Sequence, residues 1–134
     1  MEITMIIPGK PVGKGRPRFT SVGMAYTPKR TVEYENLVRL AWMQTDGAKM
    51  MTGNIKATIK AYFSMPTSWS KKKMQTMCYR PYPHKPDIDN LCKSICDSLN
   101  GLAYKDDSQI VEIQAVKLYG KEPMAIVTLK EVDQ

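Results

Sequence analysis

Apolar residues alternate with polar ones in several stretches of the chain. "EITMII" (2–7) alternates loosely and predicts a first strand. "NIKATIKAYFSM" (54–65) predicts a strand with one exposed face, because every second residue is apolar: Ile55, Ala57, Ile59, Ala61 and Phe63. "SQIVEIQAVKLYG" (108–120) and "EPMAIVTLKEV" (122–132) are separated by a short turn. They predict two further strands joined as an antiparallel hairpin.

Helical spacing of apolar residues predicts three helices. The first begins near Thr27, as its cap, and Pro28, and its apolar spacing places Trp42 in the core. "PTSWSKKKMQTM" (66–77) predicts a short basic helix that begins at Ser68 or Ser70. "IDNLCKSICDSLNG" (88–101) predicts a helix that Gly101 ends. Its expected buried side consists of Ile88, Leu91, Cys92, Ile95 and Leu99.

Between the first strand and the first helix lies "PGKPVGKGRPRFTSVGMAYTP" (8–28), rich in glycine, proline and basic residues. This composition predicts a loop, and its length favours a functional role. The order of elements predicts an α+β fold, a mixed β-sheet with helices packed on it. We expect one domain over residues 1–134.

Lysine and arginine number 20 against 13 acids, and the formal charge is +7. This balance favours an anionic partner, nucleic acid first, over a merely soluble basic protein. A hydrophobic content of 43% argues against disorder. No apolar run is long enough to span a bilayer, and the first residues do not predict a signal peptide. Three cysteines form no disulfide framework, which predicts a reducing, cytoplasmic setting.

Four aspartates stand out in this basic chain: Asp87 and Asp89 at the start of the third helix, and Asp106 and Asp107 before the strand that follows it. One aspartate of the first pair could simply cap the helix, and aspartate is common in turns before strands. These explanations leave the joint occurrence of two pairs unexplained. The strand can run back beside the helix start, so we expect the pairs to meet.

Carboxylates that meet repel each other, by ~1 kcal/mol at 4 Å in water and ~4 kcal/mol near a protein surface. A divalent cation turns this repulsion into attraction, and oxygen-only ligation suits Mg²⁺ or Mn²⁺. Such a cation bridges carboxylate and phosphate, and it can activate water. Lys93 stands one helical turn after Asp89, either as an intrahelical ion pair or aimed at a scissile phosphate. The D-x-D motif alone is weak, because phosphatases and glycosyltransferases also carry it.

The wider pattern is more specific. "KPDIDNLCKSICDSLNGLAYKDDSQI" and "GKPVGKGRPRFT…YTPKRTVEYE" resemble the RusA family of Holliday junction resolvases, in its phage and Gram-positive branch. The resemblance implies a RusA-like fold and a homodimeric, Mg²⁺-dependent endonuclease. Because oxygen-only ligation suits both metals, we expect that Mn²⁺ can substitute for Mg²⁺. It implies paired symmetric nicking of four-way DNA junctions, in recombination and repair.

The resemblance also assigns roles to residues. The essential, metal-binding acids fall on Asp87, Asp89 and Asp107, and the catalytic lysine falls on Lys93. Asp106 matches a neighbouring acid. The family often has a basic residue directly before the first aspartate, where this chain has Pro86, with Lys85 one position earlier. We expect phosphate contacts from five residues, Lys10, Lys14, Arg16, Arg18 and Lys85.

Several other residues have two interpretations. Ser70–Lys73 is either a solvated helix face or a DNA contact, and Trp69, Tyr79 and Tyr82 are candidates to stack on bases. A zinc site from the cysteines and His84 is disfavoured, because Cys92 and Cys96 fit the buried side of the helix.

The sequence therefore predicts a metal-dependent endodeoxyribonuclease for four-way junctions, without organic cofactor or membrane association. The alternatives are a nuclease for flaps or forks and a non-catalytic nucleic-acid-binding module.

Overall fold

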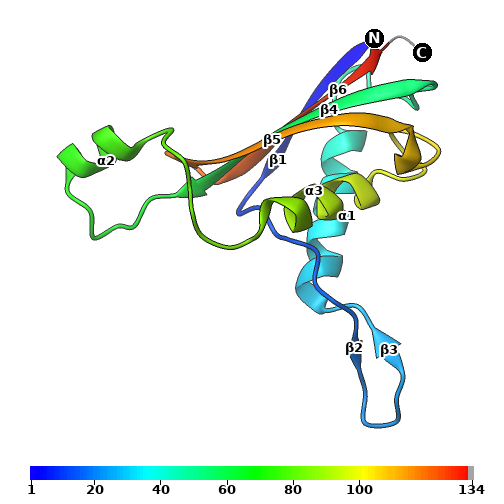
Figure 1. The fold of residues 1–134 in the computed structure, drawn as a ribbon, viewed down its shortest axis with the longest axis horizontal. Helices are drawn as coiled ribbons and strands as arrows, with labels where there is room; N and C mark the ends of the chain where they lie inside the picture. The colour runs from blue at the N-terminus through cyan, green and yellow to red at the C-terminus, as the bar shows by residue number, and fades with distance from the viewer. Residues whose placement is uncertain (133–134) are drawn as a thin grey trace.

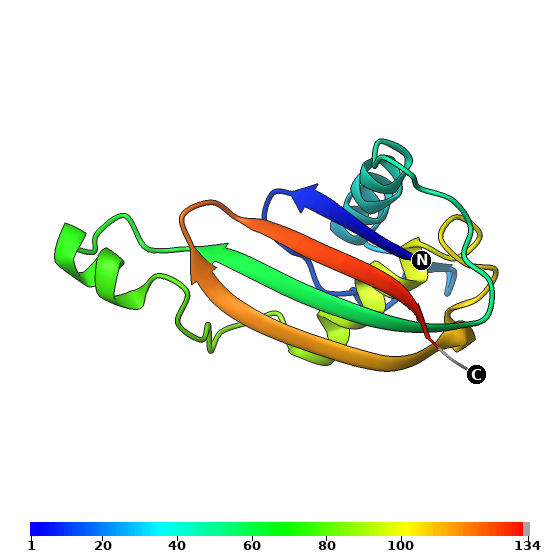
Figure 2. The ribbon, with the colours of Figure 1, turned by 90° about the horizontal axis from the view of Figure 1, so that it is seen from above.

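The computed structural model describes residues 1–132. A four-stranded sheet has the order β1 (Glu2–Pro8), β6 (Met124–Val132), β4 (Asn54–Ser64) and β5 (Ile110–Gly120). Helices α1 (Lys29–Met43) and α3 (Ile88–Ser98) lie under one face of the sheet, and the other face is open (Figure 1). Helix α2 (Lys71–Met77) lies on an arm beyond one end of the sheet (Figure 2). The predicted α+β fold with a mixed sheet is confirmed.

The core lies between the sheet and the two helices. All five apolar residues predicted for the inner side of β4 are buried. Helix α3 buries Leu91, Ile95 and Leu99 against them, and Trp42 of α1 is also buried, as predicted. Ile88 is 40% exposed instead of buried, because the whole first turn of α3 projects past the core. That projecting turn carries Asp87 and Asp89 into solvent.

The predicted hairpin of β5 and β6 is wrong. Both strands pair with β4, which lies between them: β6 is antiparallel to it and β5 is parallel to it. Ile59 of β4 faces Val127 on one side and Ala115 on the other. An alternating pattern indicates which face of a strand is buried, but it does not say which strand is the neighbour. The short connection between β5 and β6 suggested that these two strands pair with each other. They do not, because β4 lies between them in the sheet.

The ends of the helices correct two further details. Pro28 itself is the N-cap residue of α1, without a side-chain cap, so Thr27 does not cap the helix. Ser70 caps α2 as predicted, because its side chain accepts a hydrogen bond from the backbone N–H of Lys73. Gly101 follows α3 with a φ of 82°, the left-handed conformation that ends helices.

The loop predicted over residues 8–28 contains a small hairpin, formed by β2 (Arg18–Phe19) and β3 (Ala25–Tyr26). It projects away from the helices, on the side opposite the sheet (Figure 1). Within residues 1–132, no helix has the length and apolarity required to cross a bilayer.

Candidate functional site

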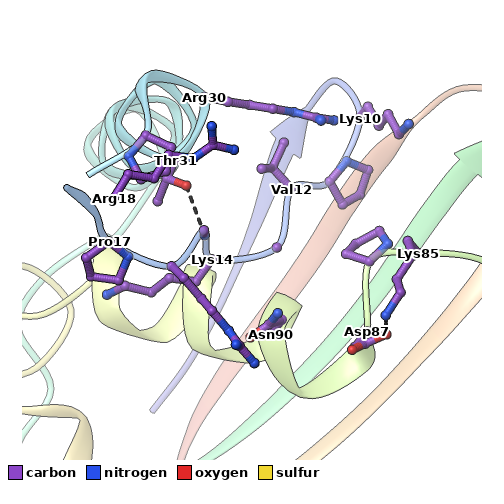
Figure 3. Close-up of a pocket in the computed structure, with 16 residues that line it drawn as sticks. Lys10, Val12, Lys14, Pro17, Arg18, Arg30, Thr31, Lys85, Asp87 and Asn90 are labelled. Carbon is purple, nitrogen blue, oxygen red and sulfur yellow. Dashed lines mark hydrogen bonds and ion pairs between the residues drawn. The ribbon is translucent and has the colours of Figure 1, made fainter. Parts of the chain in front are cut away.

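A cleft opens where the loop after β1 meets the first turns of α1 and α3 (Figure 3). Asp87 is the acid that lines it. Its walls carry six cationic residues, namely Lys10, Lys14, Arg16, Arg18, Arg30 and Lys85. The structure therefore brings all five predicted phosphate-binding residues into one place. Sequence reasoning missed Arg30, although it stands two residues after the quoted loop, within the motif "YTPKR".

Close backbone contacts hold the floor of this cleft to both helices. The backbone N–H of Gly15 donates to the Thr31 hydroxyl of α1 at 3.0 Å, and that of Lys14 donates to the Asn90 carbonyl of α3 at 3.2 Å. A Cβ atom on Gly15 would lie 2.6 Å from the Thr31 hydroxyl oxygen, closer than real atoms approach. Glycine is required there because the loop runs in direct contact with α1.

Asp87 stands at the N-cap position of α3, but its side chain makes no capping hydrogen bond. Instead it accepts a hydrogen bond of 2.7 Å from the Lys85 ammonium. This hydrogen bond and the charge of Lys85 lower the pKa of Asp87, so the exposed carboxylate is ionised at neutral pH. Helix capping therefore does not explain Asp87, which faces the cationic cleft.

Asp106, by contrast, has a structural role. It is the N-cap of the short 3₁₀ helix η1 (Asp107–Gln109), and its side chain accepts from the backbone N–H of Ser108 at 3.0 Å. The Gln109 side chain completes a capping box with the backbone N–H of Asp106. Hydrogen bonds from Ser108 lower the pKa of Asp106. The cap accounts for this acid without a function in chemistry.

Asp107 forms a carboxyl pair with Asp97, a residue that the sequence reasoning missed. Burial, followed by the hydrogen bond with Asp97, raises the pKa of Asp107. Burial also opposes ionisation of Asp97, but hydrogen bonds from Lys14 and from Asp107 outweigh it and lower the pKa of Asp97. The amide nitrogen of Asn100 lies 3.3 Å from Asp107, and the amide oxygen of Asn100 is buried without a partner.

The spacing of α3 contained a signal for Asp97. Asp89, Lys93 and Asp97 follow one another at intervals of four residues and therefore lie along one side of the helix. Lys93 is exposed, and its charge contributes to the lowered pKa of Asp97. The ammonium group of Lys14 forms an ion pair with Asp97. This ion pair connects the basic loop to the C-terminal end of α3.

The two predicted acidic pairs do not meet within one chain. Asp107 contacts residues near the C-terminal end of α3, while Asp87 and Asp89 stand at its N-terminal end, and 11 helical residues span about 16 Å. The reason is the direction of β5: its far end lies beside the helix start, where the Lys117 ammonium donates to the carbonyls of His84 and Pro86. The expectation that the strand brings the pairs together is thus wrong for a single chain.

This separation bears on metal binding. Among residues 1–132, no three side chains of His, Cys, Asp or Glu lie close enough to share a metal ion. The oxygens of Asp97, Asp107 and Asn100 are of the type that Mg²⁺ prefers, but they provide only two acids. The trio Asp87, Asp89 and Asp107 does not fit one metal within one chain.

A comparison with known families now decides the relationship. A family model described as Endodeoxyribonuclease RusA matches residues 8–130. The chain belongs to the RusA endodeoxyribonuclease family. The match includes the cationic cleft, α3 and η1, and so all of the predicted site residues. The "Uncharacterized protein YqaN" of Bacillus subtilis (strain 168) is 36% identical over 139 residues, which cover 97% of this chain and 96% of YqaN.

All three aromatic residues predicted to stack on bases have internal partners in this RusA-family chain. Tyr82 stacks on Phe63 with ring centroids 4.1 Å apart. Trp69 packs near Tyr119 and lies under the ammonium of Lys73, 4.5 Å from the ring centroid. These contacts attach the α2 arm to the ends of β4 and β5. Tyr79 contacts the ring of Tyr62 edge-on, with centroids 6.0 Å apart, and is 60% exposed.

Two of the three cysteines, Cys92 and Cys96, lie on the helix side that the sequence predicts to be buried. Cys96 is buried and Cys92 is half-buried on α3, and burial raises the pKa of the Cys96 thiol to about 12. Cys78 ends the remote helix α2. The part of the chain that the structure describes offers no zinc site that includes them.

Proposed function

We propose that this protein is a Mg²⁺-dependent endonuclease that resolves four-way DNA junctions by paired, symmetric nicks, in recombination and repair. Membership of the RusA endodeoxyribonuclease family carries the proposal. The cationic cleft supports it, because six basic residues line a cleft that reaches the start of α3, where Asp87 and Asp89 project. Such a cleft attracts a phosphate backbone and places it beside the two acids.

In this proposal Asp87, Asp89 and Asp107 hold the cation, and Lys93 faces the scissile phosphate. A cation bound there removes the repulsion between the carboxylates and the approaching phosphate. Lys10, Arg16, Arg18, Arg30 and Lys85 hold neighbouring phosphates. Lys14 contributes through its ion pair with Asp97, which fixes the loop to α3.

Because one chain does not gather the three acids, the proposal requires two chains. A four-way junction has strands related by two-fold symmetry, which a two-fold homodimer matches. The edge of β5 offers a way to assemble it. Residues 79–82 cover only the far end of this edge, and no other backbone within residues 1–132 pairs with Ile110–Val116 there. Val111 and Ile113 on this open stretch are 59% and 45% exposed.

Antiparallel pairing of two such edges about a two-fold axis places the start of one β5 near the far end of the other. Asp107 lies just before the start of β5. Near the far end of β5, the Lys117 ammonium donates to the carbonyl of Pro86, the residue before Asp87. The pairing would therefore bring Asp107 of one chain toward Asp87 and Asp89 of the partner chain.

Cleavage of end-labelled four-way junctions, with linear duplex and flapped DNA alongside, tests the proposal. We expect cuts in two opposed strands of the junction in Mg²⁺, none in EDTA, and none in the duplex. Preferential cutting of flaps would instead favour the flap or fork nuclease, and binding without cutting would favour the non-catalytic module.

Replacement of one acid tests the site itself. Asp89→Asn should abolish cleavage while junction binding stays equal or becomes tighter, because a negative charge is lost near phosphate. Asp46→Asn is the matched control, because Asp46 is an exposed acid in the turn after α1. If Asp89→Asn still cuts junctions in Mg²⁺, the proposed site is wrong.

A further inference from the structure

The hairpin β2–β3 is built as a narrow projection. Arg18 pairs with Tyr26 and Phe19 with Ala25, and the turn between them is closed by hydrogen bonds of 2.9 Å between Thr20 and Met24 and between Gly23 and Thr20. Gly23 has a φ of 83°, which this three-residue turn requires. The hairpin extends beyond the end of α1 and away from the rest of the molecule (Figure 1).

The tip of the hairpin is unusually apolar for a surface. Phe19, Val22 and Met24 are 70%, 79% and 67% exposed, and Tyr26 beside them is 48% exposed. The segment "FTSVGMAY" (19–26) contains no charged residue. Apolar residues scattered singly over a surface need no explanation, but several gathered on one projecting turn indicate a binding function.

The charges around the tip indicate what it binds. Arg16 and Arg18 precede the apolar segment and Lys29 and Arg30 follow it, so cations stand at the root of both strands. Arg16, Arg18 and Arg30 also line the cationic cleft. Figure 3 labels Arg18 and Arg30 there. A phosphate backbone in the cleft therefore passes the root of the hairpin. A second copy of this chain is a poor occupant of the tip, because the proposed dimer pairs through β5 and each tip has four cations at its root, Arg16, Arg18, Lys29 and Arg30.

The root of the hairpin is also held in place relative to the acids. The backbone N–H of Gly15 is hydrogen-bonded to the Thr31 hydroxyl of α1. Lys14 is hydrogen-bonded through its backbone N–H to the Asn90 carbonyl of α3, and its ammonium forms an ion pair with Asp97. A Cβ on Gly13 would lie 2.9 Å from the Cβ of Pro86, one residue before Asp87. A tip anchored this closely to α3 meets the DNA at a fixed distance from the cleavage site.

We propose that the hairpin is a wedge that inserts Phe19, Val22 and Met24 between bases at the branch point of a DNA junction. Apolar side chains inserted between base steps unstack them, and a branch point already interrupts the stack, so insertion there is easiest. The inference rests on the proposed function and deepens it, because it makes the hairpin the feature that selects branched over linear DNA.

The test is a variant with Phe19→Ser, Val22→Ser and Met24→Ser, compared with the wild-type protein. All three side chains are exposed, so the fold should tolerate the changes. Each protein is bound in EDTA, which prevents cutting, to a junction with 2-aminopurine at the branch point. We expect wild-type protein to raise the fluorescence of this base and the variant to leave it unchanged.

Affinity gives a second measurement. The variant should bind the junction more weakly by about tenfold or more, because stacking on one aromatic side chain alone has that order of effect. Its affinity for linear duplex and its salt dependence should stay as in wild type, because the phosphate contacts remain. Phe19→Trp should preserve the wild-type behaviour. Met43→Ser serves as the matched control, because Met43 is 61% exposed at the opposite end of α1.

Three outcomes would overturn the wedge. The variant could bind the junction and raise its fluorescence as wild type does. It could lose affinity for duplex and junction equally. Light scattering could show that the three substitutions split a wild-type oligomer, which would make the tip a contact between chains. Cleavage of junctions by wild type in Mg²⁺ is scored separately. Cleavage without the fluorescence change would reject the wedge and keep the proposed function, and the fluorescence change without cleavage would reject the proposed function and keep the wedge.

Discussion

At the scale of single residues, the carboxyl pair of Asp97 and Asp107 is where the fold brings negative charge together. Lys14 and Asn100 each donate to one member of the pair, yet Asp107 still has a raised pKa. Burial, the hydrogen bond with Asp97 and repulsion from the Asp97 charge together oppose ionisation of Asp107. Such opposition is costly for folding at neutral pH, and groups of this kind gather at functional sites. Asp97 therefore belongs with Asp107 in the candidate site.

This repulsion predicts a stability effect of Asp107→Asn. At a pH between the pKa of Asp107 in the unfolded chain and its raised pKa in the folded protein, the folded protein keeps a proton that the unfolded chain has released. The contribution of Asp107 to stability therefore falls as pH rises through this window. The variant should thus melt a few degrees above wild type at pH 7 in EDTA, a gain of at most about 1 kcal/mol. The gain should shrink as pH falls below the raised pKa.

Melting curves of both proteins from acid to neutral pH measure this difference. The difference isolates Asp107, because the ion pair of Asp97 with Lys14 is present in both proteins. A variant that melts below wild type at pH 7 would show that Asp107 stabilises the fold and that the repulsion is absent.

At the scale of elements, the loop between β1 and α1 combines two kinds of cation. Arg16 is exposed in the cleft, while the Lys14 ammonium pairs with half-buried Asp97. Sequence alone gives both residues the same role. Their surroundings predict that Arg16 contacts phosphate and that Lys14 holds the loop in position.

This difference predicts distinct salt dependences. Arg16→Ala should lower the slope of log affinity against log salt concentration by about one unit, because one phosphate contact is lost. Lys14→Ala should leave the slope near the wild-type value and reduce affinity through a looser loop. Lys49→Ala, an exposed lysine after α1, is the control for charge alone. Equal slope changes for Lys14 and Arg16 would return Lys14 to the phosphate-binding set.

At the scale of the whole molecule, α3 separates the acids. The proposed dimer resolves this by assembling each site from two chains, with Asp89 from one and Asp107 from its partner. This arrangement has a consequence for mixtures of inactive variants, because a heterodimer can contain one intact site.

Asp89→Asn and Asp107→Asn should each be inactive alone. After the two are mixed through partial unfolding and refolding, heterodimers should nick one strand of a junction, because one of their two sites has every acid. Gel analysis of labelled strands distinguishes this single nick from paired cuts. If mixtures stay inactive while capture through an affinity tag on only one variant confirms heterodimers, each site lies within one chain and the shared site is excluded.

Alternating and helical patterns determined much of this protein. They predicted strands β1, β4, β5 and β6, the three helices and the inner residues of β4, because burial of one face imposes a period that local sequence records. Composition and motif spacing singled out the cationic residues of the loop and the aspartates around α3. Local spacing, however, has no information on which strand lies beside which.

Only the tertiary structure decided which strands and which side chains lie next to one another. It placed β4 between β5 and β6, gathered the cations of the loop with Lys85 and Arg30, and paired Asp107 with Asp97 instead of Asp87. The physical reason is that these contacts join residues far apart in the chain. They follow from the direction in which β5 runs along α3, a choice made by packing of the whole core.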